Sequence, residues 1–206
     1  METRRAVDVF DHWAQIGKDE GMERGHAPSV EYMIGQMLNE QTTQFSVLDV
    51  GCGNGWVVRK FSHHPLCVEA HGVDGALSMV QKAQSIDSTC TYHHGLIPQW
   101  HPPREFTMIH SMEFLYYLHE PLEFLKILHN EWLAPSGKVI FGLDHYTENE
   151  SSLEWPASLQ VHMTCWSISE WASAFESAGF RKVSTIQIGQ KEGWEGTLVI
   201  QAESSR

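Results

Sequence analysis

The sequence is poor in basic residues. Its 14 lysines and arginines stand against 26 aspartates and glutamates, which gives a formal net charge of −12 with the 13 histidines counted as neutral. Proteins that bind nucleic acid by neutralising phosphates need clustered lysine and arginine, and attachment to an anionic membrane surface has the same requirement. The charge therefore argues against DNA and membranes as partners, and against RNA unless a partner subunit supplies a basic surface.

Cysteines and long apolar runs are also scarce. The four cysteines are Cys52, Cys67, Cys90 and Cys165. They show no C-x-x-C spacing, which favours free thiols in a reducing cytoplasm. No apolar stretch approaches the ~18–20 residues of a membrane span, and no apolar segment of signal-peptide type follows the N-terminal arginines. The histidine pairs at 63–64 and 93–94 lack the spacing of known metal motifs, so we expect no metal site.

Short β-branched runs alternate with segments of helical spacing along the chain. The predicted strands are 47–50, 67–73, 89–93, 106–110, 138–143, 183–188 and 197–201. The predicted helices are 7–16, one opening at Pro28, 56–61, 76–83, one opening at Pro121 and one after the capping box Ser167-x-x-Glu170. This alternation indicates an α/β fold with a mostly parallel sheet covered on both faces. Since no repeat or linker interrupts it, we expect one domain over 1–206.

The most informative segment is the glycine-rich stretch VLDVGCGNG at 47–55. A glycine turn between a strand and a helix lets a ligand approach the backbone closely, because no Cβ intervenes. Asp74 ends the next predicted strand, where an acid can accept hydrogen bonds from ribose hydroxyls. No lysine follows Gly55, which excludes a P-loop, and G-x-G-x-G differs from the dinucleotide fingerprint. Asp49, two residues before the first glycine, suits a cationic or zwitterionic ligand.

VLDVGCGNG, together with GVD at 72–74, resembles motif I and its companion acid in the class I S-adenosylmethionine-dependent methyltransferases. The resemblance extends from about Val47 to Gln201. It implies a Rossmann-like, doubly wound sheet of seven strands with an antiparallel last strand. It also implies S-adenosyl-L-methionine as cofactor and S-adenosyl-L-homocysteine as product. By the resemblance, Gly51, Gly53 and Gly55 line the methionine moiety, Asp49 lies beneath its amino-acid end and Asp74 takes the ribose diol.

The N-terminal segment 1–45 reads as helical and precedes the first predicted strand. Phe10, Trp13, Met22 and His26 flank its glycine-rich turns, and such a segment can fold over a bound cofactor as a lid. We therefore expect residues 1–45 to form a helical lid over a catalytic core at 46–206. An insertion near 144–166 is predicted to lie on the same rim.

Methyl transfer from a sulfonium is an in-line displacement, so the protein mainly aligns the acceptor and excludes water. A base is needed only where the acceptor must lose a proton. Ligands of open α/β sheets bind at the carboxyl ends of the strands. His145, after the fifth predicted strand, is the first choice for such a base, and Glu113, after the fourth, is the second. The residues predicted to wall the acceptor pocket are Trp13, Tyr116, Tyr146 and Trp155.

Three functions remain open from the sequence. A methyltransferase acting on a small molecule is favoured by the aromatic residues near one rim and by the lack of a basic patch. An RNA or protein methyltransferase that works with a partner subunit is the first alternative. A module that binds S-adenosylmethionine without catalysis is the second. The oligomeric state and the acceptor atom stay undetermined.

Overall fold

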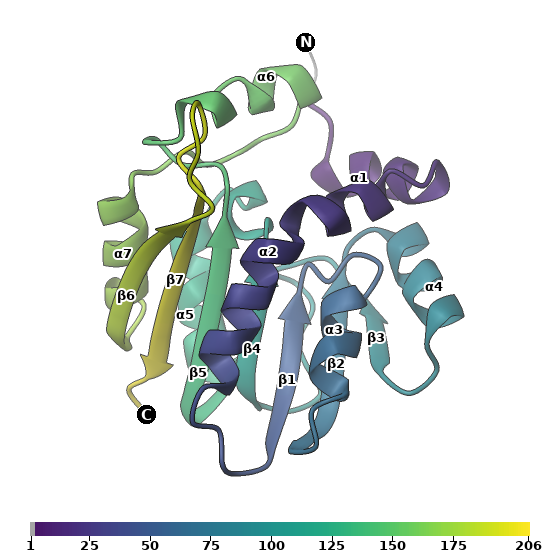
Figure 1. The fold of residues 1–206 in the computed structure, drawn as a ribbon, viewed down its shortest axis with the longest axis vertical. Helices are drawn as coiled ribbons and strands as arrows, with labels where there is room; N and C mark the ends of the chain where they lie inside the picture. The colour runs from purple at the N-terminus through teal and green to yellow at the C-terminus, as the bar shows by residue number, and fades with distance from the viewer. Residues whose placement is uncertain (1–2) are drawn as a thin grey trace.

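The computed structural model describes residues 3–206, in which seven strands form one sheet in the order β3-β2-β1-β4-β5-β7-β6 (Figure 1). The strands are β1 (Phe45–Val50), β2 (Cys67–Asp74), β3 (Thr91–His94), β4 (Phe106–Met112), β5 (Leu133–Leu143), β6 (Phe180–Ile188) and β7 (Thr197–Ser204). Neighbouring strands from β3 to β5 are parallel, whereas β7 runs antiparallel between β5 and β6. The predicted sheet, with its antiparallel last strand, is confirmed.

Helices cover both faces of this sheet (Figure 1). They are α1 (Ala6–Gln15), α2 (Asp19–Leu38), α3 (Trp56–Ser62), α4 (Leu77–Ile86), α5 (Pro121–Ile127), α6 (Trp155–Leu159) and α7 (Ile168–Ser177). α2, α3 and α4 bury Met33, Val58 and Val80 in the core on one face. α5 and α7 bury Phe124 and Trp171 in the core on the other. Each such side chain contributes roughly 1.5–3 kcal/mol when fully buried.

Strand β1 lies at the centre of the parallel part and is buried along its whole length. Its residue Asp49 is in register with Gly72 of β2 and with His110 of β4. The order of the strands reverses between β1 and β4, because β2 and β3 follow on one side of β1 and β5 lies on the other. Open α/β sheets bind their ligands beyond the carboxyl ends of the strands at such a reversal.

The second helix starts earlier than the sequence predicts. The prediction that it opens at Pro28 is wrong, because α2 begins at Asp19 and carries Pro28 in its interior. Gly21 also lies within the helix. Buried contacts hold both ends of α2: Asp19 pairs with a lysine of α4, and Met37 packs in the core. Tertiary contacts therefore outweigh the low helix propensity of glycine and proline.

The carboxyl edge of the sheet is covered by segments distant in sequence. α1 and α6 both lie above this edge (Figure 1). Arg4 forms an isolated β-bridge with Val161, which joins the N-terminal segment to the 144–166 segment. The two segments predicted to lie at the rim are thus in contact. Among residues 3–206, no helix combines the length and the apolar character that crossing a membrane requires.

Candidate active site

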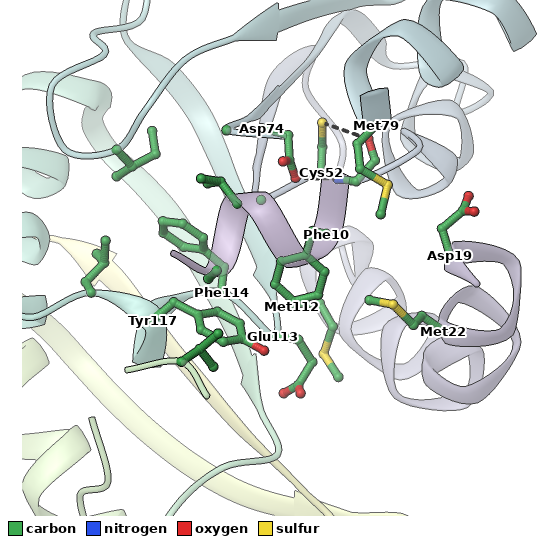
Figure 2. Close-up of a pocket in the computed structure, with 18 of the residues that line it drawn as sticks. Phe10, Asp19, Met22, Cys52, Asp74, Met79, Met112, Glu113, Phe114 and Tyr117 are labelled. Atoms are coloured by element: carbon green, nitrogen blue, oxygen red, sulfur yellow. Dashed lines mark hydrogen bonds between the residues drawn. The ribbon is translucent and has the colours of Figure 1, made fainter. Parts of the chain in front are cut away.

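A cavity of about 780 Å³ lies at the carboxyl edge of the sheet (Figure 2). The glycine loop after β1, the end of β2, the segment after β4, helices α1 and α2, and residues 156–163 all contribute to its wall. The apolar part of the wall includes Val7, Phe10, Met22, Met79, Met112, Phe114 and Met163. Cofactor and small-molecule sites have volumes of about 300–1,000 Å³. The cavity is therefore the candidate active site.

The glycine loop presents its backbone to this cavity. Gly51 and Gly53 line it, and Gly53 has a φ of 51°. A methyl group on Gly53 would have only the sulfur of Met79 near it, at 4.0 Å, so the space over this backbone is open to a ligand. Gly55 is not among the lining residues, and a methyl group there would overlap the Tyr92 ring. Gly55 thus serves the packing of the loop against β3.

Asp74 ends β2 and holds two turns of the chain. Its Oδ2 accepts the N–H of Gly53 at 2.9 Å, and its Oδ1 accepts the N–H of Ala76 at 2.7 Å. Burial raises the pKa of Asp74, and these two backbone donors oppose the rise. Asp74 lines the cavity, and each carboxylate oxygen has a second lone pair with which it can accept a ligand hydroxyl.

Asp49 lies under the glycine loop in a pair with a buried histidine. Its Oδ1 is 2.7 Å from Nδ1 of His110, and both residues are buried. Asp49 lines the cavity, so a carboxylate stands where a cationic group can approach. No local sequence pattern signals this pairing, because the partners are 61 positions apart in the chain.

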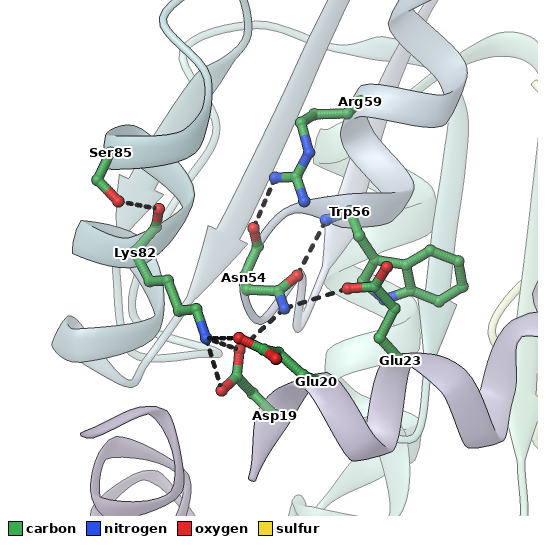
Figure 3. A network of polar contacts seen from close by, with 8 residues as sticks. All are labelled: Asp19, Glu20, Glu23, Asn54, Trp56, Arg59, Lys82 and Ser85. Carbon is green, nitrogen blue, oxygen red and sulfur yellow. Dashed lines mark hydrogen bonds and ion pairs between the residues drawn. The ribbon is translucent and has the colours of Figure 1, made fainter. Parts of the chain in front are cut away.

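A polar network ties α2 to the glycine loop (Figure 3). Nζ of Lys82, on α4, lies 2.8 Å from Oδ2 of Asp19, and Nδ2 of Asn54 donates to the same oxygen at 2.9 Å. Asn54 also accepts the N–H of Trp56 at 3.2 Å through its Oδ1. The first turn of α2 is therefore fixed to the loop and to α4, which positions the rest of α2 over the cavity.

His26, Glu113 and Asp144 converge from three elements. One potential ligand atom from each lies within 4.8 Å of those of the other two. Oε1 of Glu113 accepts the N–H of Asp144 at 2.5 Å, and Oε2 accepts the Tyr116 hydroxyl at 2.6 Å. Burial, reinforced by the Asp144 carboxylate, raises the pKa of Glu113 well above its ordinary value. Burial also raises the pKa of Asp144 and lowers the pKa of His26, so it disfavours charge on all three.

Of the two predicted base candidates, the structure brings only Glu113 to the cavity wall. His145 is buried, its Nδ1 lies 3.1 Å from the carbonyl oxygen of Ser152, and it is not a lining residue. This placement gives the imidazole of His145 no contact with the cavity. The base role of His145 stays a prediction without support from the geometry.

The four residues predicted to wall the acceptor pocket also lie outside the cavity lining. Tyr116 is buried behind Glu113, and the hydroxyl of Tyr146 donates to the carbonyl of Gly196 at 2.9 Å. Trp155 stacks on His145 with ring centroids 6.3 Å apart, and Trp13 packs edge-on against Phe10 at 5.2 Å. Trp13 and Tyr116 therefore contact residues of the cavity wall, Phe10 and Glu113, from behind.

Other residues occupy the positions expected for that pocket. The lining includes Arg4, Phe10, Phe114, Tyr117, His119 and His162. The rings of His119 and His162 stack at 3.8 Å. Phe114, Tyr117 and His119 follow β4 in the sequence, which was the available signal for them. Nothing in the sequence pairs His119 with His162, because only the fold brings the 144–166 segment over β4.

The family model described as a methyltransferase domain matches residues 14–185, and no curated protein matches the chain. Among solved structures, a Haloferax volcanii methyltransferase in complex with the Trm112 methyltransferase activator is 26% identical, with a TM-score of 0.83 over 96% of this chain and 98% of that one.

Two further structures share the fold at lower identity. An S-adenosylmethionine-dependent methyltransferase from Mesorhizobium loti is 16% identical, with a TM-score of 0.71 over 86% of this chain and 97% of that one. The N-methyltransferase NodS from Bradyrhizobium japonicum WM9, solved with S-adenosyl-L-homocysteine, is 17% identical, with a TM-score of 0.69 over 87% of each chain. With the family match covering most of the sequence, the chain belongs to the class I S-adenosylmethionine-dependent methyltransferases.

Proposed function

We propose that this chain methylates a small molecule held in the cavity. The observation that carries the proposal is the cavity itself, about 780 Å³ in volume, with a wall rich in apolar and aromatic side chains contributed by α1, α2 and residues 156–163. Such a volume suits a nucleoside-sized cofactor together with a small acceptor. The formal charge of −12 leaves little basic surface for an RNA acceptor.

The residues of the cavity fit the cofactor of this family. The open space over Gly53 accommodates a ligand against the backbone, and Asp74 offers free lone pairs for the ribose diol. We assign the methionine end to Gly51, Gly53 and Asp49, since the Asp49 carboxylate attracts an ammonium group. We assign the adenine ring to three apolar side chains of the cavity wall, Met79, Leu96 and Ile97. Met79 follows Asp74 by five residues, and Leu96 and Ile97 lie in the loop after β3.

The cofactor supplies an activated methyl group, so the protein's own task is placement and the exclusion of water. α1 and α2 contribute Phe10, Met22 and His26 to the wall. This supports the proposal that residues 1–45 form a lid over the cavity. Glu113 is held by two donors in a half-buried position that faces the cavity. We therefore place Glu113 against the acceptor, where its carboxylate can bind a proton or a cation.

Calorimetry with S-adenosyl-L-homocysteine tests the cofactor assignment. Asp74→Ala should weaken binding at least about tenfold, because hydrogen bonds to a charged acceptor contribute roughly 1.5–3 kcal/mol each. Glu176→Ala on α7 changes an exposed carboxylate away from the cavity and should bind normally. Undiminished binding by a folded Asp74→Ala variant would remove the ribose assignment.

The acceptor class is tested by a crystal structure with S-adenosyl-L-homocysteine and by a screen of small molecules for cofactor-dependent methylation. We expect a closed pocket beside the cofactor and turnover of at least one small molecule by the chain alone. An open groove lined by lysine and arginine, with no turnover of small molecules, would contradict the proposal.

A second candidate function comes from the Haloferax volcanii structure, which is a complex with an activator protein. We propose as the alternative that this chain needs an activator subunit and methylates RNA or protein. Mixing the chain with a Trm112-type activator should then give a stable complex by light scattering and switch on transfer. Full activity of the isolated chain on a small molecule would decide against this alternative.

A further inference from the structure

Glu113, Asp144 and His26 lie together although they are far apart in sequence. Glu113 directly follows β4, Asp144 directly follows β5 and His26 lies on α2. One nitrogen or oxygen from each lies within 4.8 Å of the others. His26 and Glu113 line the cavity, and Asp144 is only 4% exposed behind them. Figure 2 shows the Glu113 carboxylate at the cavity wall beside Met112.

We propose that His26, Glu113 and Asp144 bind one divalent transition-metal ion, with Zn²⁺ as the probe. One imidazole nitrogen and two carboxylates are donors that Zn²⁺ accepts, whereas Mg²⁺ and Ca²⁺ prefer sites made of oxygen alone. The proposal goes beyond methyl transfer, because ion binding at these residues can be measured without any acceptor.

One buried oxygen of the cluster lacks a partner that a cation would supply, while an interaction with the Thr197 hydroxyl opposes part of the rise in the pKa of Asp144. Oδ1 of Asp144 has no hydrogen-bond partner among the residues that the structure describes. Nε2 of His26 is 3.7 Å from Oδ2 of Asp144, which is beyond hydrogen-bond length. Within residues 3–206, no lysine or arginine forms an ion pair with Glu113 or Asp144. Buried carboxylates are costly unless they are paired or coordinate a metal.

Hydrogen bonds already orient the Glu113 carboxylate for such a role. The amide of Asp144 and the hydroxyl of Tyr116 each donate to one of its oxygens, and each oxygen keeps a lone pair for an ion. Partners of this kind orient the ligands of natural metal sites. In the tetrahedral geometry of Zn²⁺ sites, two ligand atoms lie roughly 3.4 Å apart, about 1.6 times the metal–oxygen distance. Ligand atoms up to 4.8 Å apart must therefore approach one another by up to about 1.4 Å.

An ion at this position would keep an open side toward the cavity, because His26 and Glu113 are both lining residues. Catalytic zinc sites have this form, with three protein ligands and one exchangeable position. The ion would hold an acceptor through oxygen and lower the pKa of a bound hydroxyl. Glu113 then serves as a ligand, and the acceptor class becomes an alcohol, phenol or carboxylate.

The first test measures binding of Zn²⁺ alone to the full chain after removal of metals with a chelator. We expect one equivalent by equilibrium dialysis and elemental analysis, and at least about tenfold weaker binding in His26→Gln and in Asp144→Asn. His101→Gln is the matched control, since His101 also faces a carboxylate, Oε2 of Glu131 at 3.3 Å, but on the exposed surface. Equal binding by all three variants would place the ion elsewhere and overturn the proposal.

The second test locates the ion by anomalous diffraction from crystals grown with Zn²⁺. A peak between His26, Glu113 and Asp144 supports the site, and a peak elsewhere or none overturns it. Circular dichroism confirms that each variant is folded. Calorimetry with S-adenosyl-L-homocysteine on the same samples reports the cofactor site separately, so absence of zinc binding in the unsubstituted chain, with cofactor binding intact, counts against this inference alone.

Discussion

Asp19 illustrates how a single buried carboxylate fixes an element. It is 3% exposed and bonded to Lys82 and to Asn54. Asp19→Ala leaves the Asn54 amide without this acceptor and Lys82 without its buried partner, so we expect a loss of about 1–3 kcal/mol in the free energy of unfolding. Urea denaturation measures it. Glu20→Ala removes the exposed partner of the same lysine and should change stability by less than about 0.5 kcal/mol. Equal losses of stability in the two variants would show that the buried Asp19 contributes no more than an exposed ion-pair partner.

His71 and His93 form a titratable pair at the edge of the sheet, remote from the proposed metal ligands. Nδ1 of His71 lies 3.1 Å from Nε2 of His93, and His71 also meets Glu69 at 3.0 Å. Burial lowers the pKa of His71 and of His93, an effect that Glu69 partly opposes for His71. The unfolded chain therefore binds more protons near the ordinary histidine pKa of about 6.5.

The stability that the pair confers is thus present above that pKa and is lost as the pH falls from about 7 to 5. His93→Gln should reduce the loss, measured as the urea midpoint at a series of pH values. Asp87→Asn is a suitable control. Hydrogen bonds from Cys90 and Thr89 lower the pKa of Asp87, so the stability that this carboxylate contributes is lost only below about pH 4. If the urea midpoint of His93→Gln fell with pH as steeply as that of the unsubstituted chain, the pH dependence would not come from the histidine pair.

At the scale of elements, two glycines with different surroundings predict opposite effects. Gly21 lies inside α2 with no atom within 4 Å of an added methyl group, so Gly21→Ala should stabilise the chain by up to about 1 kcal/mol. Gly55 has a φ of 78° and contacts Tyr92, so Gly55→Ala should cost about 1–3 kcal/mol through strain and overlap. Thermal unfolding of both variants measures the difference, and stabilisation by Gly55→Ala would contradict the packing role.

The same two glycines show why element prediction succeeded at one place and failed at another. Gly55 follows a buried strand and precedes a helix, so local pattern sufficed to place the loop. Gly21 and Pro28 carry local signals for a turn and a helix start, and both signals were wrong. Asp19 and its lysine partner are 63 residues apart in sequence, and no local pattern reports a contact of that range.

At the scale of the whole molecule, the charge of −12 predicts that the isolated chain does not bind nucleic acid. We expect no change in the fluorescence anisotropy of labelled duplex DNA or RNA at physiological salt when the chain is added. The chain has few basic side chains that could displace counterions from the phosphates. Binding that appears only after an activator subunit is added would support the partner-dependent alternative. Strong binding by the chain alone would contradict both the charge argument and the small-molecule proposal.

The sequence by itself determined the sheet, the family and the positions of the cofactor loop. These follow from local signals: β-branched runs, the glycines at 51–55 and an acid at the end of the second strand, all of which act within a few residues of chain. The candidate base Glu113 was reachable in the same way, since the carboxyl end of a strand is a known place for ligands.

Only the tertiary structure decided what surrounds those positions. It placed His145 and the predicted pocket aromatics outside the cavity lining. It also brought His26 of α2 within reach of Glu113 and Asp144. The physical reason is that side chains on different elements meet through packing, which depends on the whole core and leaves no periodic trace in the chain.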